Sequence, residues 1–306
     1  MKSQLLIDTD SGMDDIIAIS MLIKSNNTNI VGISTVNGLV NPVIGANNLG
    51  RILTYFGTPI DICPGVTQPI SIKSRSNQFP VIDQKRSTEL SFLKPILPEI
   101  FIGSQNSKKI ENWIYDKTIR SGGGLTIAAL GPLTNIATTI QKYGSRFTSK
   151  VNKIIIMGGT INCLGNVLPD KNAEYNFYLD PQAADIVVKS AIRIDLVTLD
   201  ATKLVPVTRN LMDTIAKMTP SSKIGRVIRQ IIMNDENDFP YFYDPLVAEI
   251  LINPTMGMYS KQLAYKVIQT GSKQGKLIRV MDSIGYVKYV TSVNTNEFYN
   301  MIVNVI

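Results

Sequence analysis

The 306-residue chain is 44% apolar and 18% charged, which is typical of a globular protein of single-domain size and excludes a disordered chain. It contains neither a run of about 20 apolar residues nor a recognisable signal peptide, so we expect a cytoplasmic protein without a membrane partner. Its net charge of +7 is spread without a basic block and fits attraction to small anions or solubility as well as it fits nucleic acid, and we expect no nucleic acid as a partner.

Short apolar runs alternate with amphipathic segments of helical length, which predicts an α/β fold with an open, mostly parallel, doubly wound sheet. Strands are predicted at residues 4–8, 30–36, 60–63, 126–130, 153–157 and 194–198. Helices are predicted at residues 14–25, 42–56, 108–120, 133–143 and 181–190.

The last third of the chain is less regular and adds helices to this pattern. Helices are predicted at residues 210–217, 224–233 and 245–251, strands at 278–282 and 286–291, and a final helix from Asn296. No repeat or linker divides the sequence, so residues 1–306 are predicted to form one domain. Residues 68–92 and 161–178 are longer than ordinary connections, which marks them as binding-loop or lid candidates.

Four aspartates lie within eight residues at the end of the first predicted strand: Asp8, Asp10, Asp14 and Asp15. Ligands of open α/β sheets bind at the carboxyl ends of the strands. Carboxylates this close repel one another unless a cation neutralises them, and helix capping explains only one or two of them. The chain contains no histidine and only two distant cysteines, so oxygen atoms must hold the cation, which indicates Ca²⁺ or Mg²⁺.

Two kinds of metal protein explain this cluster poorly. An EF-hand loop starting at Asp8 would place its glycine at Met13 and its closing glutamate at Ile19. A phosphatase of the haloacid dehalogenase type accounts for Asp-Thr-Asp at residues 8–10, but not for Gly-Met-Asp-Asp at residues 12–15.

Residues 8–15 resemble the Asp-x-Asp-x-Gly-x-Asp-Asp signature of the inosine-uridine-preferring nucleoside hydrolases. Further segments resemble that family in the same order: Leu-Gly-Pro-Leu-Thr-Asn at 130–135, Met-Gly-Gly at 157–159, Gly-Asn at 165–166, Ala-Glu-Tyr-Asn at 173–176, Asp-Pro-Gln-Ala-Ala at 180–184 and Asp-Pro-Leu at 244–246. The resemblance implies a nucleoside hydrolase-like fold and an enzyme that cleaves ribonucleosides to ribose and a free base. It also implies a homodimer or homotetramer.

Cleavage of an N-glycosidic bond requires an activated water, a grip on the ribose and relief of charge on the departing base. A hard cation helps with the first requirement by lowering the pKa of water. The resemblance implies Ca²⁺ held by Asp10, Asp15, the main-chain carbonyl of Leu130 and Asp244, with Asp10 also acting as general base. Asp8 is expected to orient its neighbours from behind them.

The resemblance implies that the ribose is bound by Asp14, Asn166, Glu174 and Asn176. Ribose hydroxyls need acceptors and amide donors, which these side chains supply. Glu174 and Asn176 alternate as residues of an extended segment do, so both could face one ligand. Met157 ends a predicted strand before two glycines and is a further substrate contact, with core packing as the alternative.

The base side departs from the family pattern, because the chain has no histidine to act as leaving-group acid; Tyr243 stands where relatives often have a histidine or an aromatic residue. Two routes remain for stabilising the departing base. Aromatic rings such as Phe79 and Tyr241 could stack on a purine, or Tyr243 or Tyr241 could donate a proton. Stacking makes purine nucleosides the leading substrate hypothesis, and a uridine or cytidine hydrolase with tyrosine as acid is the alternative.

A second departure is Leu39, which stands where relatives usually carry an asparagine. The missing amide could come from Asn37 or Asn41, or it could be lost. Two further functions remain open for the whole chain: a metal-dependent phosphohydrolase, and a nucleoside-binding protein without catalysis.

Overall fold

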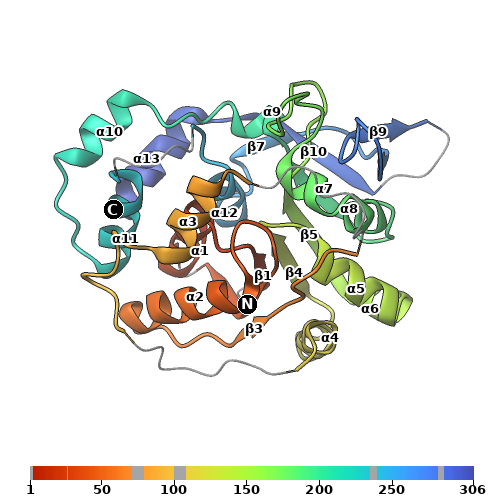
Figure 1. Cartoon of the computed structure of the whole chain (residues 1–306), viewed down its shortest axis with the longest axis horizontal. Helices are drawn as coiled ribbons and strands as arrows, with labels where there is room; N and C mark the ends of the chain where they lie inside the picture. The colour runs from red at the N-terminus through yellow and green to blue at the C-terminus, as the bar shows by residue number, and fades with distance from the viewer. Residues whose placement is uncertain (1–2, 26, 71–78, 100–107, 235–239, 282–285) are drawn as a thin grey trace.

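The computed structural model describes residues 3–25, 27–70, 79–99, 108–234, 240–281 and 286–306. An eight-stranded sheet forms its centre, in the order β3-β2-β1-β4-β5-β6-β10-β7 (Figure 1). The strands are β1 (Ser3–Thr9), β2 (Thr28–Thr35), β3 (Ile62–Pro64), β4 (Leu125–Ala129), β5 (Val151–Met157), β6 (Ile194–Val197), β7 (Gly257–Tyr259) and β10 (Val287–Val293). Every pair is parallel except β10 with β7, which confirms the predicted mostly parallel sheet.

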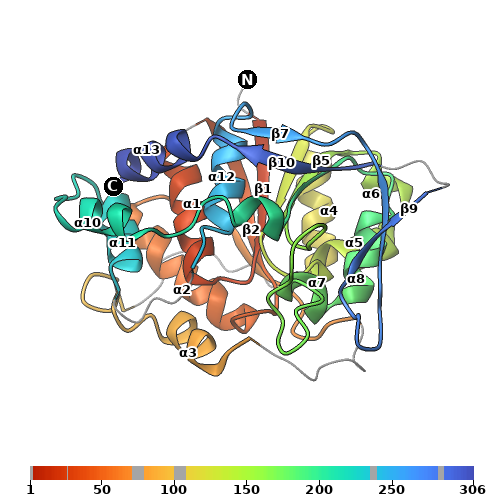
Figure 2. The same cartoon turned by 90° about the horizontal axis from the view of Figure 1, so that it is seen from above.

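Helices cover both faces of this sheet, as Figure 2 shows. One face packs against α1 (Met13–Ser25), α2 (Pro42–Phe56), α11 (Lys223–Ile232), α12 (Asp244–Ile252) and α13 (Thr295–Val305). The other packs against α4 (Ile110–Arg120), α5 (Thr134–Tyr143), α6 (Ser145–Thr148) and α8 (Pro181–Val188). Leu5 and Ile7 of β1 enter the first core and Leu6 enters the second, because successive side chains of a strand point to opposite faces. The predicted double winding is therefore confirmed.

Most predicted elements are present with ends shifted by a few residues, and the exceptions are short. The structure adds α3 (Val81–Glu89) and α7 (Tyr175–Leu179) within the two stretches predicted as long loops. It also adds α9 (Leu199–Thr202) and the strand β8 (Ala264–Val267), and it places α10 at Arg209–Ala216. Short helices with few apolar residues lack the periodicity that identifies a helix in sequence. None of the helices in the described ranges is long and apolar enough to cross a membrane.

The two carboxy-terminal strands predicted from the sequence belong to different sheets. β9 (Leu277–Val280) pairs with β8 in a separate antiparallel hairpin, whereas β10 joins the main sheet. Asp185 of α8 holds the hairpin, because its carboxylate accepts hydrogen bonds from Val267 N at 2.9 Å and Gln269 Nε2 at 2.9 Å. Residue 282, the end of one predicted strand, lies outside the described residues.

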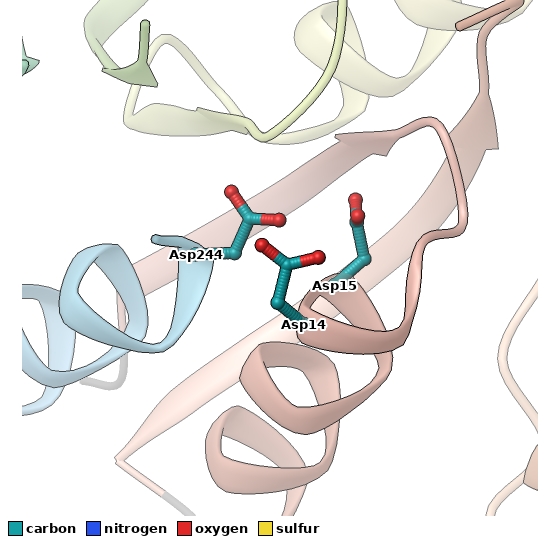
Figure 3. Close-up of side chains that lie close together, drawn as sticks. All are labelled: Asp14, Asp15 and Asp244. Atoms are coloured by element: carbon teal, nitrogen blue, oxygen red, sulfur yellow. The ribbon is translucent and has the colours of Figure 1, made fainter. Parts of the chain in front are cut away.

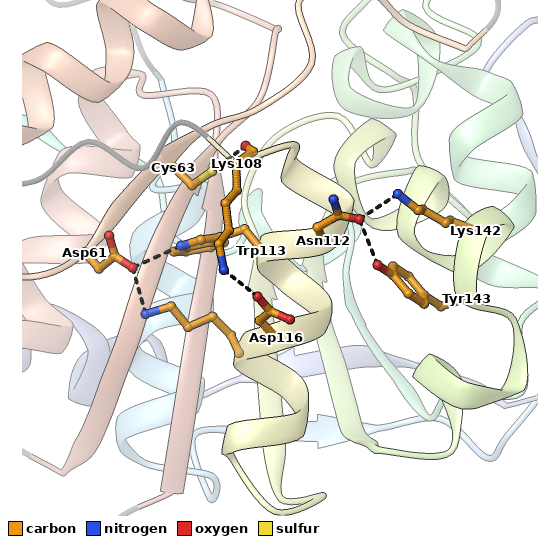
Figure 4. A network of polar contacts seen from close by, with 9 residues as sticks. Asp61, Cys63, Lys108, Asn112, Trp113, Asp116, Lys142 and Tyr143 are labelled. Carbon is orange, nitrogen blue, oxygen red and sulfur yellow. Dashed lines mark hydrogen bonds and ion pairs between the residues drawn. The ribbon is translucent and has the colours of Figure 1, made fainter.

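A polar network fastens α4 to the sheet beside β3 (Figure 4). Trp113 is buried, and its Nε1 donates to Asp61 Oδ2 at 3.0 Å. Lys117 Nζ forms an ion pair with the same carboxylate oxygen at 3.0 Å and donates to Val31 O at 2.6 Å. Gly32 of β2 leaves room for the indole, since a side chain there would overlap the ring.

Asn135, the second residue of α5, joins the carboxyl ends of the central strands. Its Nδ2 donates to Asp8 Oδ1 at 2.8 Å and to Thr35 O at 3.0 Å, at the ends of β1 and β2. Its Oδ1 accepts from Val66 N at 3.1 Å, beyond β3. The side chain is fully buried, so water cannot replace these partners.

We expect Asn135→Ala to lower the free energy of unfolding by about 2–4 kcal/mol, because three buried hydrogen bonds are lost and their partners stay buried. Urea unfolding measures this change. Asn210→Ala is the matched control, since Asn210 is exposed on α10. Equal stability of the two variants would contradict this account of Asn135.

Candidate active site

A cavity of about 490 Å³ opens at the carboxyl ends of β1, β4 and β5. Every predicted site residue except Tyr241 lines it: Asp10, Asp14, Asp15, Phe79, Leu130, Met157, Asn166, Glu174, Asn176, Tyr243 and Asp244. These residues are contributed by segments from residue 10 to residue 244. The order of motifs along the sequence therefore identified residues that the fold brings together.

The turn from β1 into α1 aims the aspartates into this cavity. Ser11 lies in the left-handed region at φ 64°, and its N–H donates to Thr9 Oγ1 at 3.0 Å. The Thr9 hydroxyl in turn donates to Asp15, and Gly12 N donates to Asp15 Oδ2 at 3.0 Å. The turn therefore holds Asp15 in one orientation in the first turn of α1.

Two neighbouring loops close tightly around Asp10. Leu39 N donates to Asp10 Oδ2 at 2.8 Å. A side chain at Gly38 or Gly131 would overlap Asp10, so both loops need glycine to approach it this closely. Burial raises the pKa of Asp10 to about 6, despite the hydrogen bond from Leu39 N. The carboxylate is thus poised to exchange a proton near neutral pH.

Three carboxylates, those of Asp14, Asp15 and Asp244, converge in this cavity (Figure 3). One oxygen from each of Asp14, Asp15 and Asp244 lies within 4.8 Å of the other two. Burial, together with neighbouring negative charges, raises the pKa of Asp14 to about 6 and the pKa values of Asp15 and Asp244 well above their usual range. The sequence analysis predicted that Asp14 binds the ribose and that Asp10 binds the metal. In the structure Asp14, and not Asp10, completes the convergent set of three carboxylates.

The donor atoms of this cluster fit a hard cation. Asp244 Oδ1 is buried and has no hydrogen-bond partner among the described residues, so it is available as a ligand. The Leu130 carbonyl, the predicted main-chain ligand, accepts from Asn176 Nδ2 at 3.0 Å and lines the same cavity. Carboxylate and carbonyl oxygens are the ligands that Ca²⁺ prefers.

Asp8 lies behind the cavity and is not among its lining residues. Its Oδ1 accepts from Ser34 Oγ at 2.6 Å and from Asn135 Nδ2. Burial raises its pKa to about 7. This position fits the predicted role of orienting neighbours.

The extended conformation predicted for the segment around Glu174 and Asn176 is wrong at Asn176, which lies in α7. Glu174 caps that helix, and its carboxylate accepts from Asn176 N at 2.8 Å, Gly159 N at 3.0 Å and Phe177 N at 3.2 Å. The Glu174 carboxylate satisfies N–H groups that the first turn of the helix leaves without partners, which the alternation of side chains in the sequence does not reveal. Both side chains still line the cavity.

The remaining predicted ribose contacts are held by their neighbours. Asn166 Oδ1 accepts from Tyr175 N at 3.1 Å, which leaves its Nδ2 amide free of that bond. Met157 ends β5, and its carbonyl accepts from Asn176 Nδ2 at 3.2 Å. Burial raises the pKa of Glu174 to about 7.

Aromatic side chains form another part of the cavity wall. Phe79 stacks on Tyr175 with ring centroids 4.6 Å apart and an interplanar angle of 23°. Burial and the nearby Asp14 raise the pKa of Tyr243, so its hydroxyl keeps its proton at neutral pH. Tyr241 lies 6.1 Å from Tyr243 between ring centroids but does not line the cavity, so the substrate contact predicted for it is not placed there. Phe239 lies outside the described residues.

Leu39 lines the cavity at the position where an amide was expected. Asn37 and Asn41 line a neighbouring hollow of about 190 Å³ instead. Asn41 Oδ1 caps α2 by accepting from Val43 N at 3.0 Å. Of the two replacements considered from the sequence, neither reaches the cavity in this structure.

Sequence reasoning missed several lining residues: Met13, Pro80, Asp83, Ser87, Leu168, Tyr175 and Pro240. Tyr175 lies between two predicted site residues, so its position was a usable signal. Asp83 and Ser87 lie on α3, and nothing in the sequence separated them from other polar residues of that stretch.

Comparisons with known proteins identify a family for the chain. The family profile described as "Inosine-uridine preferring nucleoside hydrolase" matches residues 5–300. "Uridine nucleosidase 1" of Arabidopsis thaliana is 30% identical over 271 residues, which cover 84% of this chain and 76% of that protein. "Probable uridine nucleosidase 1" of Oryza sativa subsp. japonica is 32% identical over 206 residues, covering 66% of this chain and 60% of that protein.

Bacterial proteins match as well. "Pyrimidine-specific ribonucleoside hydrolase RihA" of Escherichia coli O9:H4 is 33% identical over 204 residues, covering 66% of this chain and 62% of that protein. The solved structure of a plant nucleoside hydrolase, PpNRh1, superposes with a TM-score of 0.85 at 23% identity, covering 100% of this chain and 99% of that one. A purine-preferring ribonucleoside hydrolase from Gardnerella vaginalis gives 0.83 at 23% identity, covering 99% and 97%. At this identity the two structures support the fold alone.

We expect Ca²⁺ to raise the melting temperature relative to chelated protein, because a ligand that binds only the folded state stabilises it, by about 2.7 kcal/mol at 100 times its Kd. Asp244→Asn is expected to remove most of this shift. Asp213→Asn, at an exposed position of α10, is the matched control and should keep it. Thermal melts of the three proteins with Ca²⁺ or chelator measure the effect, and an unchanged shift in Asp244→Asn would contradict it.

The Ca²⁺-dependent shift should grow as pH rises from 5 to 8. The raised pKa values of about 6 for Asp10 and Asp14 mean that the folded, metal-free protein binds more protons than the unfolded chain. Metal-free stability therefore falls as pH rises from about 4 through these values, while Ca²⁺ requires the ionised carboxylates. Melting temperatures across this range, with and without Ca²⁺, provide the test; a shift that shrinks with rising pH would refute the prediction.

Proposed function

Because the chain belongs to the inosine-uridine preferring nucleoside hydrolase family, we propose that it hydrolyses ribonucleosides to ribose and a free base, with Ca²⁺ as its cofactor. The observation that carries this proposal is one cavity that combines convergent buried carboxylates with an aromatic wall. The carboxylates suit a cation, a water and ribose hydroxyls. The aromatic wall suits a flat base.

Asp10, Asp15, the Leu130 carbonyl and Asp244 would hold the cation, which supplies positive charge that makes a nearby water more acidic. Asp10 removes the proton from the attacking water. Leu39 N keeps one of its oxygens in place, which a general base acting on a nearby water requires. Asn176 keeps the Leu130 carbonyl in position through its Nδ2.

Asp14, Asn166, Glu174 and Asn176 bind the ribose in this proposal. Asp14 is half-buried at the start of α1 and is one of the three convergent carboxylates, so it can accept from a hydroxyl close to the cation. The backbone N–H groups of Gly159 and Asn176 donate to the Glu174 carboxylate, which fixes its orientation. The ribose therefore meets acceptors whose positions are set before it binds.

We further propose that the preferred base is a pyrimidine and that Tyr243 assists its departure. Aromatic stacking made purines the leading hypothesis from sequence, but the relatives from Arabidopsis, rice and Escherichia coli are named for uridine or pyrimidines. The raised pKa of Tyr243 keeps its hydroxyl protonated, so it can donate a hydrogen bond to the departing ring. Phe79 and Tyr175 remain available as apolar contacts for the base.

The other hypotheses explain less of the cavity. A phosphohydrolase sharing only the Asp-x-Asp opening leaves Glu174 and Asn176 without a role. A nucleoside binder without catalysis would bind the same ligand but show no turnover. The homodimer or homotetramer and the cytoplasmic location stay predictions.

We expect the protein to release reducing sugar from uridine or cytidine faster than from inosine, adenosine or guanosine, and chelator to suppress this activity. Asp10→Ala should reduce kcat by about 10²- to 10⁴-fold, because the general base is lost. A steady-state panel of the five nucleosides measures both effects, with Asp213→Asn as control. Turnover of none of the five would contradict the proposed function, and a preference for purines would contradict the proposed base.

Tyr243→Phe should reduce kcat for uridine by about 10- to 100-fold with little change in KM, because phenylalanine can contact the base but cannot donate. Tyr286→Phe, which removes a hydroxyl from a partly exposed tyrosine beside β10, should leave kcat unchanged. Steady-state kinetics of both variants separate the two contributions. An unaltered kcat in Tyr243→Phe would mean that Tyr243 only stacks on the base and donates no hydrogen bond to it.

A further inference from the structure

One face of α3 forms part of the cavity wall and has no role in the chemistry described so far. Asp83 and Ser87 are four residues apart on this helix, so their side chains lie on the same face, and both line the cavity. They were not among the residues recognised from the family motifs.

Ser87 presents a polar group that lacks a partner. The residue is only 1% exposed, and its Oγ makes no hydrogen bond to any described residue. A buried hydroxyl without a partner is destabilising, and such groups are usually satisfied by water or by a ligand. Because Ser87 lines the cavity, a bound ligand can satisfy it.

Asp83 supplies carboxylate oxygens, which accept hydrogen bonds. It lies in the first turn of α3, where the helix dipole favours negative charge, and Arg86 Nη1 lies 3.7 Å from its Oδ1. Its charge also helps to raise the pKa of Tyr175, which places it near the Phe79–Tyr175 stack. About a third of the side chain is exposed, so a ligand can reach it.

We propose that Asp83 and Ser87 recognise the polar edge of the base: Asp83 accepts from a base N–H, and the Ser87 hydroxyl pairs with the acceptor next to it. In uracil these two groups are the ring N3–H and a neighbouring carbonyl oxygen. This inference rests on the proposed function and names the part of the substrate that α3 reads.

The composition of the wall favours the base over the sugar as the group that meets α3. A base has two apolar faces and one polar edge, and α3 offers its two polar groups close to the stacked rings of Phe79 and Tyr175. The carboxylates and amides that suit ribose hydroxyls lie instead at the strand ends and at the starts of α1, α7 and α12. The sugar 5′-hydroxyl is the competing partner for Asp83.

The test compares kcat/KM for uridine, 3-methyluridine, which lacks the N3–H, and 5′-deoxyuridine. If the wild type prefers purines, inosine and 1-methylinosine form the corresponding pair. The wild type should prefer the N–H substrate by about 10- to 100-fold, the range for a hydrogen bond to a charged group. Asp83→Ala should reduce this preference to within about threefold of unity.

Asp83→Asn keeps the size of the side chain and weakens its acceptor, so its preference should fall between those of the wild type and Asp83→Ala. Ser87→Ala should lower kcat/KM for uridine by about 5- to 10-fold and keep the preference for the N–H. Glu89→Gln removes a negative charge from an exposed position of the same helix and is the control for charge alone. Thermal melts confirm that each variant is folded.

Three results would overturn the inference. An unchanged preference in Asp83→Ala shows that Asp83 does not face the base N–H. A wild-type preference retained in full by Asp83→Asn but lost in Asp83→Ala shows that size, not hydrogen bonding, excludes the methyl group. Discrimination against 5′-deoxyuridine that disappears in Asp83→Ala assigns Asp83 to the sugar. In each case turnover of uridine continues, so the proposed function stands; absence of turnover by the wild type would contradict that function itself, and this inference with it.

Discussion

Mutual repulsion among buried carboxylates is the constraint on which this structure depends. Asp10, Asp14, Asp15 and Asp244 lie in one cavity, and burial raises all four pKa values. Neighbouring negative charges add to the rise at Asp14, Asp15 and Asp244. Such a cluster is unfavourable in an isolated chain and becomes favourable once a cation neutralises it. The cluster lowers the stability of the metal-free protein. The proposed hydrolysis requires these carboxylates to be charged and held in fixed positions, which explains why they lie together.

The fold holds these charges together by placing rigid elements around the end of β1. Backbone N–H groups of Gly12 and Leu39 orient two of the carboxylates, and α12 brings Asp244 to the site from far along the chain. Asn135 joins the ends of β1 and β2 behind them. The cavity lies at the carboxyl end of β1, which has β2 as its neighbour on one side and β4 on the other. Ligands of open parallel sheets bind where the strand order reverses in this way.

The sequence predicted the sheet and the acidic cluster at the end of β1 because both depend on strong local patterns. Apolar strands such as β1 and acidic residues at their ends, as at Asp10, are visible without knowing any contact. Helix α3 was missed because its residues are mostly polar, and its buried face is defined only by what packs against it. The conformation of Asn176 was mistaken because the cap formed by Glu174 depends on backbone donors as distant as Gly159. No local sequence pattern distinguishes Tyr243 from Tyr241, and only the folded structure shows that Tyr243 lines the cavity whereas Tyr241 does not.

Calorimetric titration of the protein with Ca²⁺ at pH 6, in two buffers with different ionisation enthalpies, measures whether the buried carboxylates bind a cation and release protons when they do. Carboxylates with raised pKa values hold protons at this pH and must release them when the cation binds. We expect one Ca²⁺ to bind per chain, with a binding enthalpy at pH 6 that differs between the two buffers. At pH 8 we expect binding without proton release. Binding of Ca²⁺ without proton release at pH 6, or no binding at all, would contradict this account of the carboxylates.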